Sequence, residues 1–153
     1  MLSTISRLTA VSFAALAIAG CSMGGGGQLS SGLTQRMDMP GVQLNRGEAV
    51  GIINNYRSST GSGALTEDPT LDANAQALAA QYAKTGKQAA KPPGAVGIRY
   101  SAGYYTFAET FSGWRNSPAD ASALTDKSAT KAGVAAVYDS QSSYGVYWVI
   151  ILG

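Results

Sequence analysis

Few side chains in this chain of 153 residues could carry out chemistry, and their types narrow the possibilities. The sequence contains no histidine and a single cysteine, Cys21. Without an imidazole, Ser-His-Asp and Cys-His catalysis and histidine-ligated zinc sites are excluded, and a lone cysteine excludes an intramolecular disulfide. Any catalysis would therefore have to rely on carboxylates alone, and Glu109 and Asp120 are the two candidates.

The one cysteine follows a segment with the features of a secretory signal. Arg7 precedes an apolar stretch, residues 8–19, that is shorter than the roughly 20 residues needed to span a bilayer. Residues 18–21 read Ile-Ala-Gly-Cys and resemble a lipobox, whose cysteine thiol receives a diacylglyceryl group. We therefore expect residues 1–20 to be a lipoprotein signal peptide and Cys21 to carry the lipid. An ordinary signal peptide with an incidental cysteine is the alternative, but the only cysteine stands where the motif requires it.

The residues after Cys21 predict a protein tethered to the bacterial cell envelope. By resemblance to Gram-negative lipoproteins, Ser22 rather than an aspartate at this place indicates the outer membrane, with the protein facing the periplasm. Residues 21–42 include a run of four glycines and are predicted to be a flexible tether with a reach on the order of 25 Å. Residues 43–153 are predicted to be one folded domain.

Composition limits the partners of this domain. The formal net charge is only +2, and 13% of the residues are charged. A nucleic-acid-binding protein usually carries a clear basic excess, so we expect no nucleic-acid partner. The glycine runs lack the Gly-Lys-Ser/Thr of a phosphate-binding loop, and we assign no cofactor and no metal.

Apolar periodicity predicts helices followed by paired strands. Three stretches have apolar residues at helical spacing, namely residues 45–59, 68–86 and 106–116. Residues 134–138 and 146–152 are rich in β-branched and aromatic residues and predict an antiparallel hairpin, while residues 87–103 are predicted to be irregular. This order favours an α+β layered domain.

Four stretches, in their order along the chain, resemble the CAP (SCP/PR-1) domain superfamily in its short bacterial form. They are residues 53–57 (Ile-Asn-Asn-Tyr-Arg), residues 65–71 (Leu-Thr-Glu-Asp-Pro-Thr-Leu), residues 114–118 (Trp-Arg-Asn-Ser-Pro), and residues 133–135 with Tyr147-Trp148. The resemblance implies an α-β-α sandwich, with a small antiparallel sheet flanked by helices and a cleft over the sheet.

The sequence departs from this family where the cleft residues are expected. Asp120 stands at the position of a family histidine, and a second histidine has no counterpart. Residues 97–99 replace a family Ala-Glu-Asn segment, which places Ile98 where the cleft glutamate would be. Ile98 and Asp120 are therefore the candidate cleft positions, although Asp120 is better explained as part of a turn or as a helix N-cap.

Glu109 has two interpretations. The segment Ala108-Glu109-Thr110 imitates Ala-Glu-Asn, but it lies too close to Trp114 for the family spacing. Because Glu109 follows Thr106 by three residues, the pair has the spacing of a capping box. We favour the helix cap over the cleft carboxylate.

Two surface features could meet a partner. A basic stretch could contact anionic lipid or cell-wall polymer, or could be an ordinary solvated loop: Lys84, Lys87, Lys91 and Arg99. Three tyrosines could line a ligand groove, or could pack at a domain edge with their hydroxyls outward: Tyr100, Tyr104 and Tyr105.

The sequence therefore predicts a lipid-anchored envelope protein with a degenerate, non-catalytic CAP-like domain. Its expected partners are the membrane, through Cys21, and a lipid, cell-wall or protein ligand. The alternatives are a carboxylate-dependent hydrolase that uses Glu109 and Asp120, and a purely structural periplasmic lipoprotein.

Overall fold

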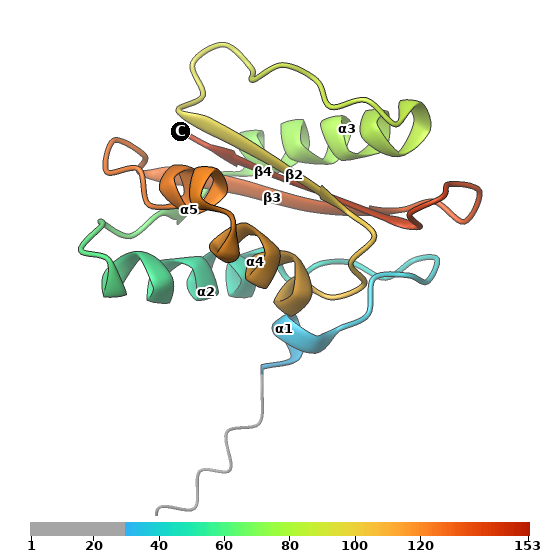
Figure 1. Ribbon diagram of the computed structural model, residues 1–153, viewed down its shortest axis with the longest axis horizontal. Coiled ribbons are helices and arrows are strands. Elements are labelled where there is room, and N and C mark those ends of the chain that lie inside the picture. The colour runs from blue at the N-terminus through green and yellow to red at the C-terminus, as the bar shows by residue number, and fades with distance from the viewer. Residues whose placement is uncertain (1–29) are drawn as a thin grey trace, which may run out of the picture.

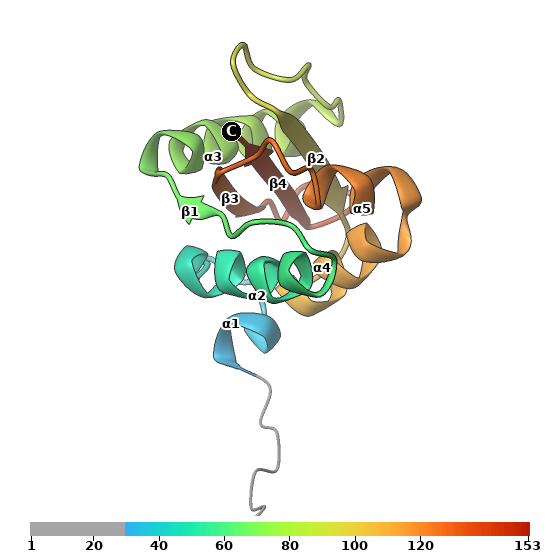
Figure 2. The ribbon, with the colours of Figure 1, turned by 90° about the vertical axis from the view of Figure 1, so that its left-hand side faces the viewer.

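The computed structural model of the protein describes residues 30–153, which form a sheet between two layers of helices (Figures 1 and 2). The elements are α1 (Ser31–Thr34), α2 (Arg46–Ser59), β1 (Thr66–Glu67), α3 (Pro69–Thr85), β2 (Gly97–Ala102), α4 (Phe107–Asn116), α5 (Pro118–Leu124), β3 (Lys131–Tyr138) and β4 (Val146–Leu152). Helix α3 covers one face of the sheet, and α2, α4 and α5 lie on the other side (Figure 2). The predicted α+β class and α-β-α sandwich are confirmed.

The sheet has the strand order β1-β3-β4-β2, so β4 lies in its interior. β3 and β4 pair antiparallel, as the predicted hairpin requires, and β2 pairs antiparallel with the other side of β4. The short β1 pairs parallel with β3, opposite Lys131 and Ala132 only. This parallel pair makes the sheet mixed rather than antiparallel throughout, and within residues 30–153 it leaves most of the outer edge of β3 without a strand neighbour.

The first two long helices form where their capping residues predict. The side chain of Asn45 accepts a hydrogen bond from the backbone N–H of Glu48 at the start of α2. Asp68 accepts hydrogen bonds from the N–H groups of Thr70 and Leu71, which satisfies two free donors at the start of α3. Gly86 ends α3 with a φ of 66°, a left-handed conformation that glycine adopts without strain.

The stretch 87–103 is not irregular throughout, because residues 97–102 form β2. Prolines and glycines flank this strand in the sequence, and they favour the prediction of an irregular segment. Within the strand the polar Arg99 and Ser101 alternate with the apolar Ile98 and Tyr100, and β4 supplies the hydrogen-bonding partner. The strand therefore depends on a neighbour that lies about 50 residues away in the sequence.

The domain begins earlier than predicted, because residues 30–42 do not behave as part of a flexible tether. They contain α1, and Met37 is 3% exposed within the core. The backbone N–H of Met37 also donates to the carbonyl of Tyr105 at 2.8 Å. Leu33 and Val42 pack against the same core, and their apolar character is masked in the sequence by the surrounding glycine and serine. Cys21 and the predicted signal peptide lie outside the described residues.

The core has two parts, one on each side of the sheet. Trp114, Trp148 and Phe107 dominate the part that faces α2, α4 and α5, and small alanines dominate the part under α3. A Cβ atom at Gly133 would overlap the backbone of Leu71 and Asp72, so glycine is what allows α3 to lie directly on β3. Among residues 30–153, none of the helices has the length and apolar character to cross a bilayer.

Candidate functional site

Asp120, one of the two predicted cleft positions, lies in the first turn of α5 and forms an ion pair. The Nε atom of Arg99 is 2.9 Å from Oδ1 of Asp120, and each side chain is 29% exposed. The Nη2 group of Arg99 also donates to the carbonyl of Ala119 at 3.0 Å. Ser117, not Asp120, occupies the N-cap position of α5. The carboxylate of Asp120 therefore joins α5 to β2 and is not available as an unpaired base.

The other predicted cleft position, Ile98, faces away from Asp120. Successive side chains of a strand point to opposite faces, and Ile98 packs with the apolar cluster under α3 while Arg99 faces α5. The structure thus brings Arg99, and not Ile98, to Asp120. The alternation of side chains would have identified Arg99 had residues 97–102 been predicted as a strand.

A hollow of about 380 Å³ lies beside this ion pair, between the start of β2 and α5. Lys91, at its rim, donates to the carbonyl of Val96 at 3.3 Å. Asp126 accepts hydrogen bonds from the hydroxyl and the backbone N–H of Ser128, which lower the pKa of Asp126. Each charged side chain that lines the hollow therefore already has a hydrogen-bond or ion-pair partner.

Glu109 is a helix cap. Its Oε2 atom accepts hydrogen bonds of 3.0 Å from the backbone N–H groups of Tyr105 and Thr106 and from the hydroxyl of Thr106. The Thr106 hydroxyl in turn accepts from the N–H of Glu109, which completes the predicted capping box at the start of α4. These bonds, that of the Thr106 hydroxyl above all, lower the pKa of Glu109. Asp120, on α5, instead pairs with Arg99, so the two candidate carboxylates lie on separate helices and have separate partners.

Sequence reasoning missed the role of Arg57, which lies in the stretch that resembles the first helix of the family. Its side chain is fully buried and donates to four backbone carbonyls, at 2.6 to 3.1 Å: Gly63, Leu124, Asp126 and Ala129. Burial lowers the pKa of Arg57. The guanidinium ties α2 to two loops, and only its position in a family-like stretch distinguishes it in the sequence.

The remaining sequence-predicted groups are spread over the surface. Tyr100 is half-buried, and its hydroxyl donates to the carbonyl of Ala89 at 3.1 Å. Tyr104 and Tyr105 are each 41% exposed. In the predicted basic stretch, Arg99 is paired with Asp120, whereas the three lysines are exposed.

The two outer edges of the sheet are treated differently. Strand hydrogen bonding alternates, so every second residue of an edge strand turns its N–H and C=O groups away from the sheet. On β2 the outward carbonyls of Ile98 and Tyr100 accept from Arg99 Nη1 and from Trp114 Nε1. On β3 the N–H of Val134 donates to Asp72 Oδ1 at 2.9 Å, and its carbonyl accepts from Arg46 Nε at 3.2 Å.

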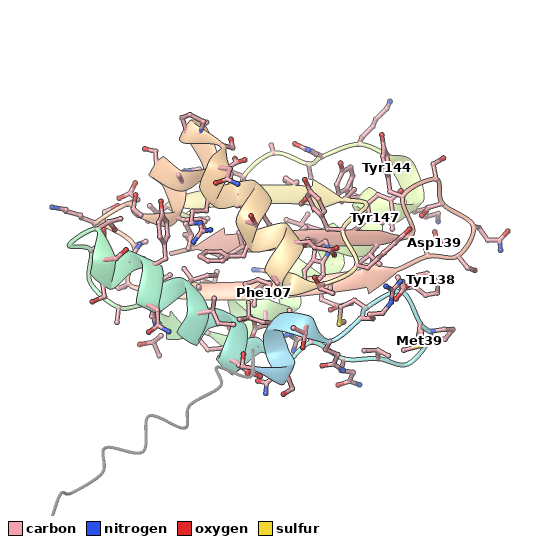
Figure 3. All side chains as sticks on the ribbon, turned by 60° about the horizontal axis from the view of Figure 1, so that its bottom comes forward. Met39, Phe107, Tyr138, Asp139, Tyr144 and Tyr147 are labelled. Atoms are coloured by element: carbon pink, nitrogen blue, oxygen red, sulfur yellow. The ribbon has the colours of Figure 1, made fainter. Side chains whose placement is uncertain are left out.

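Farther along β3, the edge is open. The outward N–H and C=O groups of Ala136 and Tyr138 have no hydrogen-bond partner among residues 30–153. Two hollows of about 410 and 230 Å³ follow this edge, between residues 39–44 and Gln76 of α3. Figure 3 shows Tyr138 and Asp139 at the end of β3, with Met39 on the neighbouring segment.

Comparison with protein families decides what this domain is. A family model described as CAP, cysteine-rich secretory protein family, matches residues 50–152. The chain belongs to the CAP family. Within the part of this CAP protein that the structure describes, no group of three or more His, Cys, Asp and Glu side chains could hold a metal ion.

Several solved structures share the fold of this domain. An outer surface protein from Borrelia burgdorferi is 17% identical, with a TM-score of 0.56 over 73% of this chain and 96% of that one. An extracellular SCP-domain protein from Bacillus anthracis is 18% identical, with a TM-score of 0.58 over 71% of this chain and 40% of that one. MpPR-1i, also 18% identical, has a TM-score of 0.57 over 69% and 87% of the two chains. No curated protein sequence matches the chain significantly.

Proposed function

We propose that this CAP protein is a lipid-anchored binding protein of the bacterial cell envelope and that its domain does not catalyse a reaction. The observation that carries the proposal is the Arg99–Asp120 ion pair, which occupies the region where the family resemblance places the cleft residues. An arginine is permanently protonated and cannot serve as a general base. Its pairing with Asp120 replaces a reactive arrangement with a structural one.

The other carboxylate candidate supports the same conclusion. Glu109 accepts three hydrogen bonds at the start of α4 and is committed to the capping box. Glycoside hydrolysis by two carboxylates requires both to flank one bond. Glu109 and Asp120 instead have separate partners on separate helices.

The envelope location is supported by the sequence and by the relatives. The lipobox-like residues 18–21 provide the anchor, and several acyl chains on one cysteine would hold the protein firmly, at about 0.8 kcal/mol per buried methylene. The fold is shared with proteins described as an outer surface protein and as an extracellular protein. Ser22 favours the outer membrane.

Anchoring is tested by expressing the full chain in a Gram-negative host and comparing it with Cys21→Ser. We expect the parent chain in the outer-membrane fraction, with the intact mass of an acylated Cys21, and the variant free of acyl groups and released. A parent chain that carries no acyl mass would contradict the anchor.

The absence of catalysis is tested separately, on panels of ester, peptide and glycoside substrates. We expect no turnover above that of a chain carrying Glu109→Ala and Asp120→Ala together. A turnover that either substitution abolishes, while the unfolding midpoint stays within the range expected for a lost cap or ion pair, would establish the hydrolase instead.

A further inference from the structure

We propose that the open part of the β3 edge, from Ala136 to Tyr138, binds an extended peptide segment of a partner protein as an added strand. This inference rests on the proposed function, which makes the domain a binding module, and it names the site and the class of partner. It is independent of how the domain is anchored.

The direction of the backbone groups on β3 is fixed by its pairing with β4. Lys131 and Gly153 exchange backbone hydrogen bonds, and the N–H of Asp139 donates to the carbonyl of Gly145. The odd-numbered residues of β3 therefore direct their backbone N–H and C=O groups toward β4. Ala136 and Tyr138 must turn their N–H and C=O groups outward, where the described residues offer them no partner.

The first half of the same edge shows what satisfies such groups. The carbonyl of Ala132 accepts from the N–H of Asp68, next to the short parallel strand β1. At Val134, the side chains of Asp72 and Arg46 take over the role of a strand. Beyond Val134, no side chain among residues 30–153 forms such hydrogen bonds with the edge. The edge thus already pairs with one extended segment and leaves two donors and two acceptors for another.

Hollow space lies beside this edge, where an added strand would run. The two hollows, about 410 and 230 Å³, adjoin each other and share Val42, Gln76 and Ala136 in their lining. Met39, 52% exposed, stands near Tyr138 at one end, where an apolar side chain of the peptide would lie. The half-exposed Arg46 lies at the other end. Alternate side chains of an added strand would meet these walls.

The chemistry of the edge favours a polypeptide over an acyl chain. Ala136 and Tyr138 are two residues apart, so their paired donors and acceptors repeat at about 6.5–7 Å along the strand. Another extended backbone presents the complementary groups at the same repeat, and this is how β-strand addition gives affinity. Acyl chains have no such donors.

The first test is amide hydrogen exchange of the full chain, measured by NMR. We expect fast exchange at Ala136 and Tyr138 and slow exchange at Ala135 and Val137, whose N–H groups donate to β4. Protection of Ala136 and Tyr138 in a monomer would mean that the chain's own amino-terminal segment covers the edge. Protection that grows with protein concentration would mean that a second copy does. Either result would overturn the proposal.

The second test uses phage-displayed random heptapeptides as the probe. We expect enriched peptides to protect the amides of Ala136 and Tyr138 and to lose at least about tenfold in affinity for Ala136→Pro, which deletes one outward donor. Proline fits an edge strand whose N–H faces outward, so the ladder to β4 stays intact. Ala102→Pro, the same substitution at an outward-facing position of the other sheet edge, β2, is the matched control and should bind normally.

N-methylation of a selected peptide distinguishes strand addition from side-chain binding. We expect methyl groups at alternate amides to abolish binding and those at the intervening amides to have little effect. Peptides that bind Ala136→Pro as well as the parent, a uniform N-methylation response, or no enrichment at all would each overturn the proposal. Because none of these readouts depends on Cys21 or on turnover, they separate this inference from failure of the proposed function.

Discussion

The two outer strands of the sheet, β2 and β3, differ in how their outward backbone groups are hydrogen-bonded. On β2, side chains from the strand itself and from α4 hydrogen-bond to the outward carbonyls of Ile98 and Tyr100. On β3, Asp72 and Arg46 do the same for Val134, and then the protection stops before Ala136. Unpaired edges attract other chains. The two edges therefore differ in which backbone groups are covered: on β2 the outward carbonyls are occupied, whereas on β3 beyond Val134 neither the N–H nor the C=O groups have a partner among residues 30–153.

The largest effect is expected from removing Trp114, which covers a carbonyl of the β2 edge. Trp114 is 2% exposed, and its Nε1 donates to the carbonyl of Tyr100 at 3.1 Å. Trp114→Ala should lower the free energy of unfolding by about 3–5 kcal/mol, measured by urea denaturation, because it leaves a cavity and an unpaired carbonyl. Trp114→Phe keeps most of the ring and should cost less. If Trp114→Ala lowers the free energy of unfolding by less than about 1 kcal/mol, the contact of α4 with the β2 edge contributes little to stability.

The protected half of the β3 edge should respond next. Asp72→Ala leaves the buried N–H of Val134 without an acceptor and should destabilise by about 1–3 kcal/mol. Asp72→Asn is the control, since its amide oxygen still accepts. Exchange of the Val134 amide should accelerate only in the alanine variant. Equal acceleration in both would mean that the charge, not the hydrogen bond, protects this position.

A smaller contribution is expected from the Arg99–Asp120 pair. Both side chains are partly exposed, and such pairs are worth about 0.2–1 kcal/mol. A double-mutant cycle with Arg99→Ala and Asp120→Ala should give a coupling energy in this range that weakens in high salt. A coupling energy well above this range would contradict the prediction, because it would mean that this partly exposed pair contributes more than a surface ion pair.

The smallest effect should come from Glu67 in β1. Burial, followed by a hydrogen bond to Asp72, raises the pKa of Glu67. A raised folded-state pKa means that the stabilisation is present below the unfolded pKa and is lost as the pH rises through the folded value. Glu67→Gln should therefore stabilise the protein at pH 7 by less than about 1 kcal/mol, with no gain in acid. Thermal unfolding at several pH values measures this, and a gain that persists in acid would contradict it.

Local signals predicted what local interactions determine. The caps at Asn45, Asp68 and Thr106 lie beside the helices that they start, and the β3–β4 hairpin joins neighbouring segments. β1 and β2 escaped prediction because each exists only through a strand distant in sequence. The Arg99–Asp120 pair was not predicted for the same reason, since the direction of the Arg99 side chain depends on the formation of β2.

Arg57 has a consequence for the order of folding. Its guanidinium is buried among carbonyls that lie 6 to 72 residues away along the chain, with no carboxylate in contact among residues 30–153. The cost of removing this charge from water is offset only when both loops are in place, so the contact belongs to the late, non-local part of folding. We therefore expect changes at Arg57 to accelerate unfolding far more than they slow folding.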